Sequence, residues 1–280
     1  MDGTFDTLLN SQQSLGAFGL GATWSLDDDT YLIEAILRPQ VFHNDIINST
    51  DFPASISLLF NQDWLHVKTT GSYLVREPLM DEALNLYSFT GFLANPNLKP
   101  ETGYSWDSSV EVDYQQWTFK VAPTASWISN EITYLMNPDY TSQNVNASGT
   151  STHFVLVNEV DYQLFKWAKL FTSYTYTKAV DSTGTDLPLI STHTFRLGAD
   201  SDFGGASLTS YSPYTASGSK TTVVARNEVD AYLQHAFKEG FKLRLDGKNL
   251  LDDRTPSEVY YDGWYPSEGR TFTASASWAF

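Results

Sequence analysis

The feature that most constrains the fold is an alternation of apolar and polar side chains with a period of two residues, which recurs along almost the whole chain. Such alternation puts one kind of side chain on each face of a β-strand. Helical periodicity is nearly absent, so the pattern predicts an all-β protein. The clearest example is the last segment, whose apolar face carries Phe272, Ala274, Ala276, Trp278 and Phe280 between threonines and serines.

Other segments set charged residues against the apolar face. Phe241, Leu243 and Leu245 alternate with Lys242, Arg244, Asp246 and Lys248. Aromatic residues make up 15% of the chain although its mean hydropathy is −0.29, and they are scattered among serine, threonine and asparagine. No stretch reaches the length of an apolar membrane-spanning helix. Strands with one lipid-facing and one water-facing side suit an antiparallel transmembrane β-barrel.

One hairpin allows the strand register to be predicted. If Gln115 and Gln116 form a two-residue turn, apolar residues face apolar residues and opposite charges face each other across the hairpin. This register pairs Tyr114 with Trp117, Val112 with Phe119 and Glu111 with Lys120.

The same pattern predicts about thirteen strands, separated alternately by short turns and long loops. The strands are 15–26, 30–43, 54–61, 64–77, 104–115, 117–134, 153–165, 167–180, 193–203, 206–214, 221–237, 240–251 and 270–280. The short turns are Asp27-Asp28-Asp29, Gln62-Asp63, Gln115-Gln116, Lys166, Gly204-Gly205 and Lys238-Glu239. The long loops are 44–53, 78–103, 135–152, 181–192, 215–220 and 252–269.

Short turns on one side and long loops on the other are typical of an outer-membrane barrel, with short periplasmic turns and long extracellular loops. A soluble all-β protein has no reason to sort its loops in this way. Because bacterial barrels normally have an even number of strands, thirteen strands indicate an incomplete barrel. The alternative is a further strand within Thr4–Leu9, which would give a closed barrel of about fourteen strands. The first fourteen residues have no signal peptide, so we expect the exporting segment to lie outside this sequence.

Several short segments resemble conserved motifs of the TonB-dependent outer-membrane receptors. Asn95-Pro96-Asn97-Leu98-Lys99-Pro100-Glu101 resembles the NP-x-L-x-PE signature that opens the strand after a long extracellular loop. Val75-Arg76-Glu77-Pro78 resembles F-[RK]-A-P at the end of the preceding strand, with Val75 in place of Phe and Glu77 in place of Ala.

Further motifs follow in the family's order. Ser14–Gly19 together with Leu37-Arg38 is similar to a mid-barrel hairpin of the family. The segment 248–254 resembles its "eNLfDkrY" strand end, and 269–272 resembles the "pGRtf" start of its last strand. The terminal Phe280 resembles the signal read by the outer-membrane assembly machinery.

The resemblance implies a barrel of 22 strands in the outer membrane of a Gram-negative bacterium, filled by an N-terminal plug that carries the TonB box. Residues 1–280 would supply the last thirteen strands, without a plug domain. The implied activity is energised uptake of a siderophore, cobalamin, carbohydrate or similar scarce ligand. The implied partners are outer-membrane lipid, the plug and the TonB energy-transducing complex. Transport belongs to the intact receptor, and a stand-alone fragment is not expected to transport.

Aromatic residues in the predicted extracellular loops are candidates for contact with the small-molecule ligand. The alternative is that they belong to the aromatic girdle at the membrane interface, an ambiguity that Tyr134 and Tyr140 share. The candidates are Tyr87, Phe89, Phe92, Tyr260, Tyr261, Trp264 and Tyr265.

Charged residues predicted to face the lumen are candidates for a permeation path. The alternative role is the formation of cross-strand ion pairs or of contacts with the plug, and Asp230 with Lys248 is a predicted pair. The candidates are Glu111, Asp113, Glu159, Asp161, Arg196, Arg226, Glu228, Asp230, Arg244 and Lys248.

Other functions have little support in the sequence. The formal charge of −16 argues against nucleic-acid binding, and the absence of cysteine removes thiolate metal sites and cysteine nucleophiles. The five histidines are far apart, no hydrolase motif is present, and Asp27–Asp29 is too compact for a calcium cage. We therefore predict no enzyme activity, no metal site and no cofactor. Two rival functions remain open: a self-contained small barrel that acts as a passive channel or structural protein, and an outer-membrane barrel enzyme.

Overall fold

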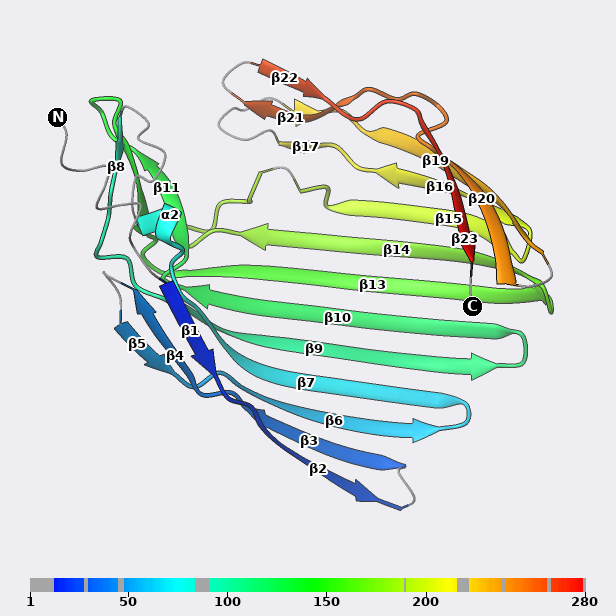
Figure 1. Ribbon diagram of the computed structural model, residues 1–280, viewed down its shortest axis with the longest axis horizontal. Coiled ribbons are helices and arrows are strands. Elements are labelled where there is room, and N and C mark those ends of the chain that lie inside the picture. Colours follow the sequence, from blue (N-terminus) through cyan, green and yellow to red (C-terminus); the bar gives the residue numbers. More distant parts are fainter. Residues whose placement is uncertain are drawn as a thin grey trace.

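The computed structural model describes residues 13–27, 30–44, 48–83, 91–188, 190–215, 222–237, 240–260 and 263–278. Its main element is an antiparallel sheet in which each strand pairs with the next long strand of the chain (Figure 1). The sheet consists of β2 (Leu20–Leu26), β3 (Tyr31–Leu37), β6 (Ala54–Gln62), β7 (Leu65–Arg76), β9 (Glu101–Tyr114), β10 (Trp117–Ser129), β13 (Thr150–Phe165), β14 (Ala168–Val180), β15 (His193–Ser201), β16 (Gly204–Tyr211), β19 (Arg226–Ala236), β20 (Phe241–Lys248) and β23 (Thr271–Trp278).

The structure confirms the predicted all-β class and the predicted thirteen strands. The sheet is strongly curved but does not close into a complete barrel (Figure 1). Within the described residues, β2 pairs only with β3, and β23 pairs only with β20. The alternative strand within Thr4–Leu9 lies outside the described residues.

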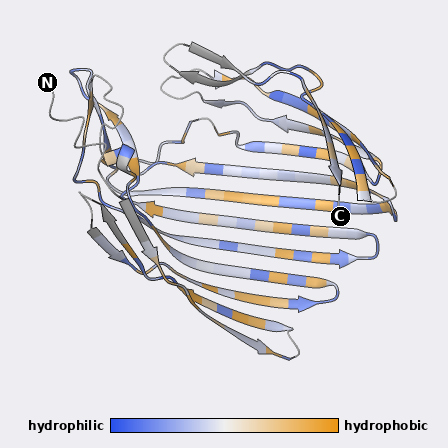
Figure 2. Ribbon diagram, in the orientation of Figure 1, coloured by the Kyte–Doolittle hydropathy of each residue, from blue (hydrophilic) through white to orange (hydrophobic). Residues whose placement is uncertain are grey.

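Strand register separates the side chains onto two faces. The predicted pairing of Tyr114 with Trp117 and of Glu111 with Lys120 is observed. Because directly paired residues lie on the same face, the apolar positions of neighbouring strands join into one apolar face and the charged positions into one charged face. Hydrophobic and hydrophilic stretches are interspersed along the strands (Figure 2).

The apolar face is open to its surroundings and has the dimensions of a membrane band. Tyr104 and Tyr114, at opposite ends of β9, are 64% and 62% exposed. The roughly 34 Å of strand between them covers about 26 Å along a barrel axis at a tilt of about 40°, close to the apolar band of outer-membrane barrels. Aromatic contacts line the short-turn end of the sheet: Tyr31–Phe60, Trp117–Tyr162, Phe165–Trp167, Trp167–Phe203 and Phe241–Trp278.

The connections alternate in length as predicted, and the long ones contain further secondary structure. One small sheet has the order β1–β4–β5, a second has the order β11–β12–β8, and two hairpins pair β17 with β18 and β21 with β22. No helix in the described part of the chain is long and apolar enough to cross a membrane. These elements are β1 (Gln13–Ala17), β4 (Gln40–Asn44), β5 (Asn48–Asp51), α2 (Met80–Ala83), β8 (Phe92–Leu93), β11 (Ile132–Met136), β12 (Ser142–Asn146), β17 (Tyr214–Thr215), β18 (Thr222–Val223), β21 (Pro256–Tyr260) and β22 (Gly263–Pro266).

Five predicted strands are interrupted in the structure: 15–26, 30–43, 117–134, 206–214 and 221–237. The segments 15–26 and 30–43 each divide into two strands, because Pro39 has no N–H to donate to a sheet ladder. The backbone N–H of Phe18 instead donates to the carbonyl of Pro39 at 3.0 Å. The segment 117–134 divides at Asn130, whose φ of 57° is left-handed and ends the regular strand.

Two predicted turns are displaced. The turn between β15 and β16 is Asp202-Phe203, because Ser201 pairs with Gly204. Gly204 and Gly205 lie in β16, where a Cβ on Gly204 would approach the carbonyl oxygen of Tyr232 to 2.5 Å. These glycines therefore allow close strand approach rather than a turn. The turn between β6 and β7, predicted at Gln62-Asp63, lies one residue later, because Gln62 pairs with Leu65. The predicted turn Lys238-Glu239 lies outside the described residues.

Candidate functional site

All ten charged candidate residues lie on the charged face of the sheet. Glu111, Glu159, Arg196 and Glu228 lie in a single row across the strands, in register with Lys120, Ser173 and Thr209. The remaining six lie in neighbouring rows on the same face: Asp113, Asp161, Arg226, Asp230, Arg244 and Lys248.

Several of these charges are paired. Lys120 forms its ion pair with Glu159 at 3.6 Å, although its register partner on the other side is Glu111. Other ion pairs join Lys169 with Asp161, Arg226 with Glu228 and Arg244 with Asp246. Among the described residues no ion pair joins Asp230 with Lys248, and Oδ1 of Asp230 instead accepts a hydrogen bond from the backbone N–H of Asn249 at 2.8 Å.

Three arginines of the charged face stack on aromatic rings. The guanidinium of Arg244 lies 3.9 Å from the ring centroid of Tyr232, and that of Arg196 lies 5.0 Å from the centroid of Phe171. The third is Arg226 over Tyr211. A hollow of about 360 Å³ lies in this region and is lined by residues that include Arg196, Asp230, Tyr232, Arg244 and Lys248. This part of the face can therefore offer both charges and aromatic rings to a molecule that lies against it.

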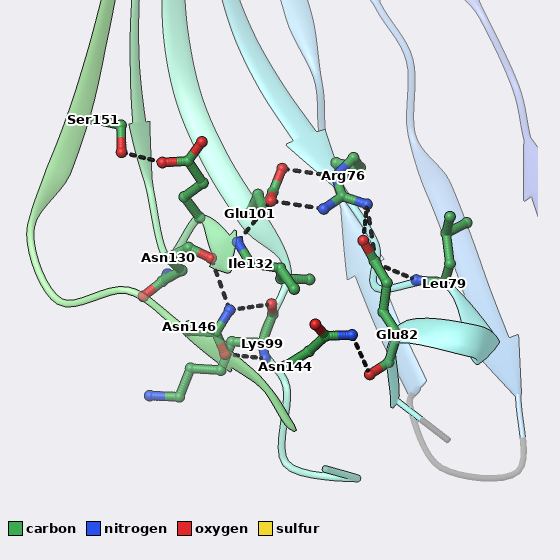
Figure 3. Close-up of polar contacts among 11 residues, drawn as sticks. Arg76, Leu79, Glu82, Lys99, Glu101, Asn130, Ile132, Asn144, Asn146 and Ser151 are labelled. Carbon is green, nitrogen blue, oxygen red and sulfur yellow. Dashed lines mark hydrogen bonds and ion pairs between the residues drawn. The ribbon is translucent and has the colours of Figure 1, made fainter. Parts of the chain in front are cut away.

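At the long-loop end of the sheet, the two motif segments around β7 and β9 meet. Nε and one terminal nitrogen of Arg76 each donate to the Glu101 carboxylate at 2.6 Å (Figure 3). The other terminal nitrogen of Arg76 donates to Glu82 of α2 at 3.0 Å. Glu101 also accepts the backbone N–H of Ile132, the first residue of β11, at 2.8 Å. Arg76 and Glu101 thus connect two wall strands with two long loops.

Asparagines of β12 complete this connection. Nδ2 of Asn146 donates to the carbonyls of Lys99 and Asn130, and its Oδ1 accepts the N–H of Lys99 (Figure 3). Nδ2 of Asn144 donates to the carbonyl of Glu82 at 3.0 Å. In turn, the carbonyl of Asn144 accepts a hydrogen bond from Nδ2 of Asn95, in the NP-x-L-x-PE segment, at 2.8 Å. We call the residues Arg76, Glu82, Asn95, Lys99, Glu101, Asn144 and Asn146 the loop clamp.

The two C-terminal motifs form a second connection of the same kind. Asn249 is buried, and its Nδ2 donates to the carbonyls of Asp253 and Glu268. Oδ1 of Asp252 accepts the backbone N–H of Arg270 at 2.9 Å. A Cβ on Gly269 would lie 2.9 Å from the same Asp252 oxygen, so a larger residue here would displace the Asp252 side chain. These hydrogen bonds join the start of the β20–β23 connection to its end, next to the two wall strands.

Three long connections contain the same Asp-x-Thr turn. Asp139, Asp181 and Asp253 each accept the backbone N–H and the hydroxyl of the threonine two residues later. Hydrogen bonds from threonine to the ionised carboxylate lower the pKa of each aspartate below its ordinary value. These turns fix the local course of the loops.

The aromatic candidates are only partly described. Tyr87, Phe89 and Tyr261 lie outside the described residues. Phe92 lies in β8 and pairs in parallel with Ser142 of β12, beside the loop clamp. The backbones of Tyr260, Trp264 and Tyr265 lie in the β21–β22 hairpin, and their side chains are outside the described part of the structure. Of the two ambiguous tyrosines, Tyr134 is 51% and Tyr140 87% exposed.

Sequence reasoning identified the motif segments but not the clamp, since the partner residues Asn144 and Asn146 belong to a loop without a recognisable pattern. In the described part of the chain, no three histidine or acidic side chains are grouped in a way that could hold a metal ion.

Comparisons with known proteins agree with this geometry. The family model "TonB dependent receptor-like, beta-barrel" matches residues 10–250. No curated protein matches the sequence.

Solved structures resemble the fold at low sequence identity. A mutant of the ferric enterobactin receptor of Pseudomonas aeruginosa has 17% identity and a TM-score of 0.74, over 95% of this chain and 45% of its own. The copper transporter OprC has 14% identity and a TM-score of 0.76, over 96% of this chain and 48% of its own. The FrpB iron transporter of Neisseria meningitidis has 13% identity and a TM-score of 0.72, over 97% of this chain and 46% of its own.

The chain therefore spans less than half the length of these structural relatives. The match of the family model over most of the sequence, the thirteen-stranded antiparallel sheet and the motif segments at its long-loop end lead to one conclusion. The chain belongs to the TonB-dependent receptor-like β-barrel family.

Proposed function

We propose that this chain forms part of the wall of a receptor in the outer membrane of a Gram-negative bacterium, which takes up a scarce small-molecule ligand. The observation that carries the proposal is the separation of the thirteen-stranded sheet into an exposed apolar face and an opposite face that carries the ten charged candidates. An apolar face of membrane height requires lipid on that side. The charged face then lines the lumen, and its ten candidate residues lie along the path of a ligand or against a plug.

The ligand class is proposed from the structural relatives. Their titles describe a ferric enterobactin receptor, a copper transporter and an iron transporter. An iron chelate of the siderophore type, or a metal complex, is therefore the first ligand class to test, with cobalamin and carbohydrate as the others. Uptake would also require a plug and the TonB energy-transducing complex, both of which are proposals for the whole protein.

The long connections should face the outside of the cell. These 280 residues contain no cysteine, so a cysteine introduced among them is the only one in this part of the protein. We expect a membrane-impermeant maleimide to label Thr183→Cys, in a long loop, in intact cells. Gln116→Cys, in a short turn, should react only after the outer membrane is permeabilised.

The orientation experiment needs the chain exported within the whole protein and has two informative outcomes. Labelling of both cysteines in intact cells, or of Gln116→Cys alone, would contradict the proposed location and orientation. Uptake of a radiolabelled ferric siderophore by the same cells, lost in a strain without TonB, would then support the import function. If the two cysteines show the expected orientation but the cells take up no ferric siderophore, only the siderophore class of ligand is excluded.

A further inference from the structure

Two carboxyl side chains from different sheets meet beside the end of β7. Glu77 follows β7 directly and is only 9% exposed. Its Oε1 accepts a hydrogen bond from the hydroxyl of Ser49, and the carboxyl of Asp51 interacts with the Glu77 side chain. Ser49 and Asp51 both belong to β5, in the small sheet that projects from the long-loop end. The contact therefore joins a loop sheet to the barrel wall.

Both carboxyl groups have an enclosed oxygen with no donor. Oδ2 of Asp51 and Oε2 of Glu77 are shielded from solvent, and neither has a hydrogen-bond partner among the described residues. Two adjacent carboxylates with enclosed oxygens repel each other when both are ionised. A proton shared between them removes one charge and supplies the missing donor.

The neighbouring cation does not neutralise the pair. Arg76 directs its guanidinium to Glu101 and Glu82, which leaves Asp51 as the charged group that acts on Glu77. Burial raises the pKa of Glu77 to about 7, and the carboxyl of Asp51 adds to this shift against the opposing hydrogen bond from Ser49. Glu77 is also a residue at which the chain departs from the F-[RK]-A-P pattern, which has alanine there. The carboxyl is therefore a property of this chain rather than of the motif.

We propose that Asp51 and Glu77 share one proton and form a pH-sensitive latch that holds the β4–β5 hairpin against the end of β7. When that proton is lost to solvent, two carboxylates repel each other in an enclosed site, and the hairpin moves away from the wall. The latch acts on a loop at the mouth of the sheet. It does not depend on which ligand the receptor takes up, so the two proposals fail separately.

The latch can be tested by spin labelling at Thr50→Cys, a single cysteine on the exposed side of β5. In the whole protein, in detergent or in vesicles, the nitroxide should be immobilised at low pH. It should become mobile with a midpoint near pH 7. Glu77→Gln keeps a neutral donor opposite Asp51 and should remain immobilised at all pH values tested. Glu77→Ala, which restores the motif residue, should show no transition near pH 7.

The matched control is Glu159→Gln, which removes a carboxylate of the wall far from the latch and should leave the transition unchanged. Circular dichroism checks that every variant keeps its strand content. The proposal is overturned if the label shows no transition, or if Glu77→Gln keeps it. It is equally overturned if calcium immobilises the label at high pH and a chelator releases it, since the pair would then hold a metal ion instead of a proton.

Discussion

Arg76 joins three elements at the long-loop end. It belongs to β7, and its guanidinium reaches Glu101 of β9 and Glu82 of α2. The Glu101 side chain is only 13% exposed. A carboxylate in such a position depends on its donors, because the hydrogen bonds to a charged group are stronger than neutral ones and the unpaired group would be desolvated.

Replacement of Arg76 by methionine should therefore be costly. It leaves two carboxylates without their main donor, and we expect a loss of about 1.5–3 kcal/mol in the free energy of unfolding. Chemical unfolding of the protein in detergent micelles measures this loss. The control is Arg254→Met, which breaks an ion pair in which the arginine is 67% exposed and should cost no more than about 1 kcal/mol. Equal losses for the two variants would contradict the special role of Arg76.

Gly198 offers a second test at the same scale. A Cβ at this position would lie 2.4 Å from the carbonyl oxygen of Ala206 and 2.5 Å from Cζ of Phe171, the ring under Arg196. We expect Gly198→Ala to destabilise the sheet by about 1–3 kcal/mol through overpacking. Gly71→Ala is the matched control, because a Cβ on Gly71 has no atom within 4 Å. Unfolding curves of both variants measure the difference in stability. A Gly198→Ala protein with an unchanged free energy of unfolding would rule out crowding at this position.

At the scale of elements, the predictable features were those carried by side-chain alternation. The hairpin at Gln115-Gln116 could be placed to the residue, because a shift of one position would exchange its two faces. The turn at Gly204-Gly205 could not, because glycine serves both turns and close strand contacts. The loop clamp was out of reach for a third reason: its contacts join residues distant in sequence, such as Asn146 and Lys99.

The Asp-x-Thr turns lead to a prediction about pH. The pKa of Asp181 lies below its ordinary value of 3.8, because Thr183 and Thr185 donate to the carboxylate. A lowered folded pKa means that the stabilisation of the turn is complete above the ordinary value and is lost as pH falls through the folded pKa. Carbon NMR of the Asp181 carboxyl should therefore show a titration midpoint below 3.8. A midpoint at or above this value would contradict the observed hydrogen bonds.

Substitution tests the same turn at neutral pH. Asp181→Ala removes the acceptor, and the backbone amides of Thr183 and Thr185 should then exchange with solvent faster. Asp181→Asn keeps a carbonyl acceptor and should give intermediate rates. Amide exchange measured at one pH for all three proteins provides the comparison, with the amides of β13 as an internal reference.

The whole sheet has a geometrical property that limits how it can be completed. β2 and β23 are its first and thirteenth strands, and successive strands are antiparallel, so these two edges run in the same direction. Direct closure would create a parallel seam. Antiparallel closure requires an odd number of additional strands between the two edges, which agrees with the even strand count of bacterial barrels. A second copy of the chain in the same membrane orientation would add thirteen strands, but its β2 and β23 would meet the edges of the first copy in the parallel sense.

The open edges should be visible in the protein formed by these residues alone. Lipid cannot satisfy the backbone groups along β23 that point away from β20. We therefore expect these amides to exchange much faster than those of the central strand β13, which is paired on both sides.

The same protein should give no steady single-channel conductance in a planar bilayer, because an open sheet encloses no pore. Co-refolding with a segment that supplies an odd number of strands should protect the amides of both β23 and β2, whereas a segment with an even number should protect only one of these two edges. Stable conductance, or uniform protection of β13 and β23 without any added segment, would instead favour a self-contained barrel.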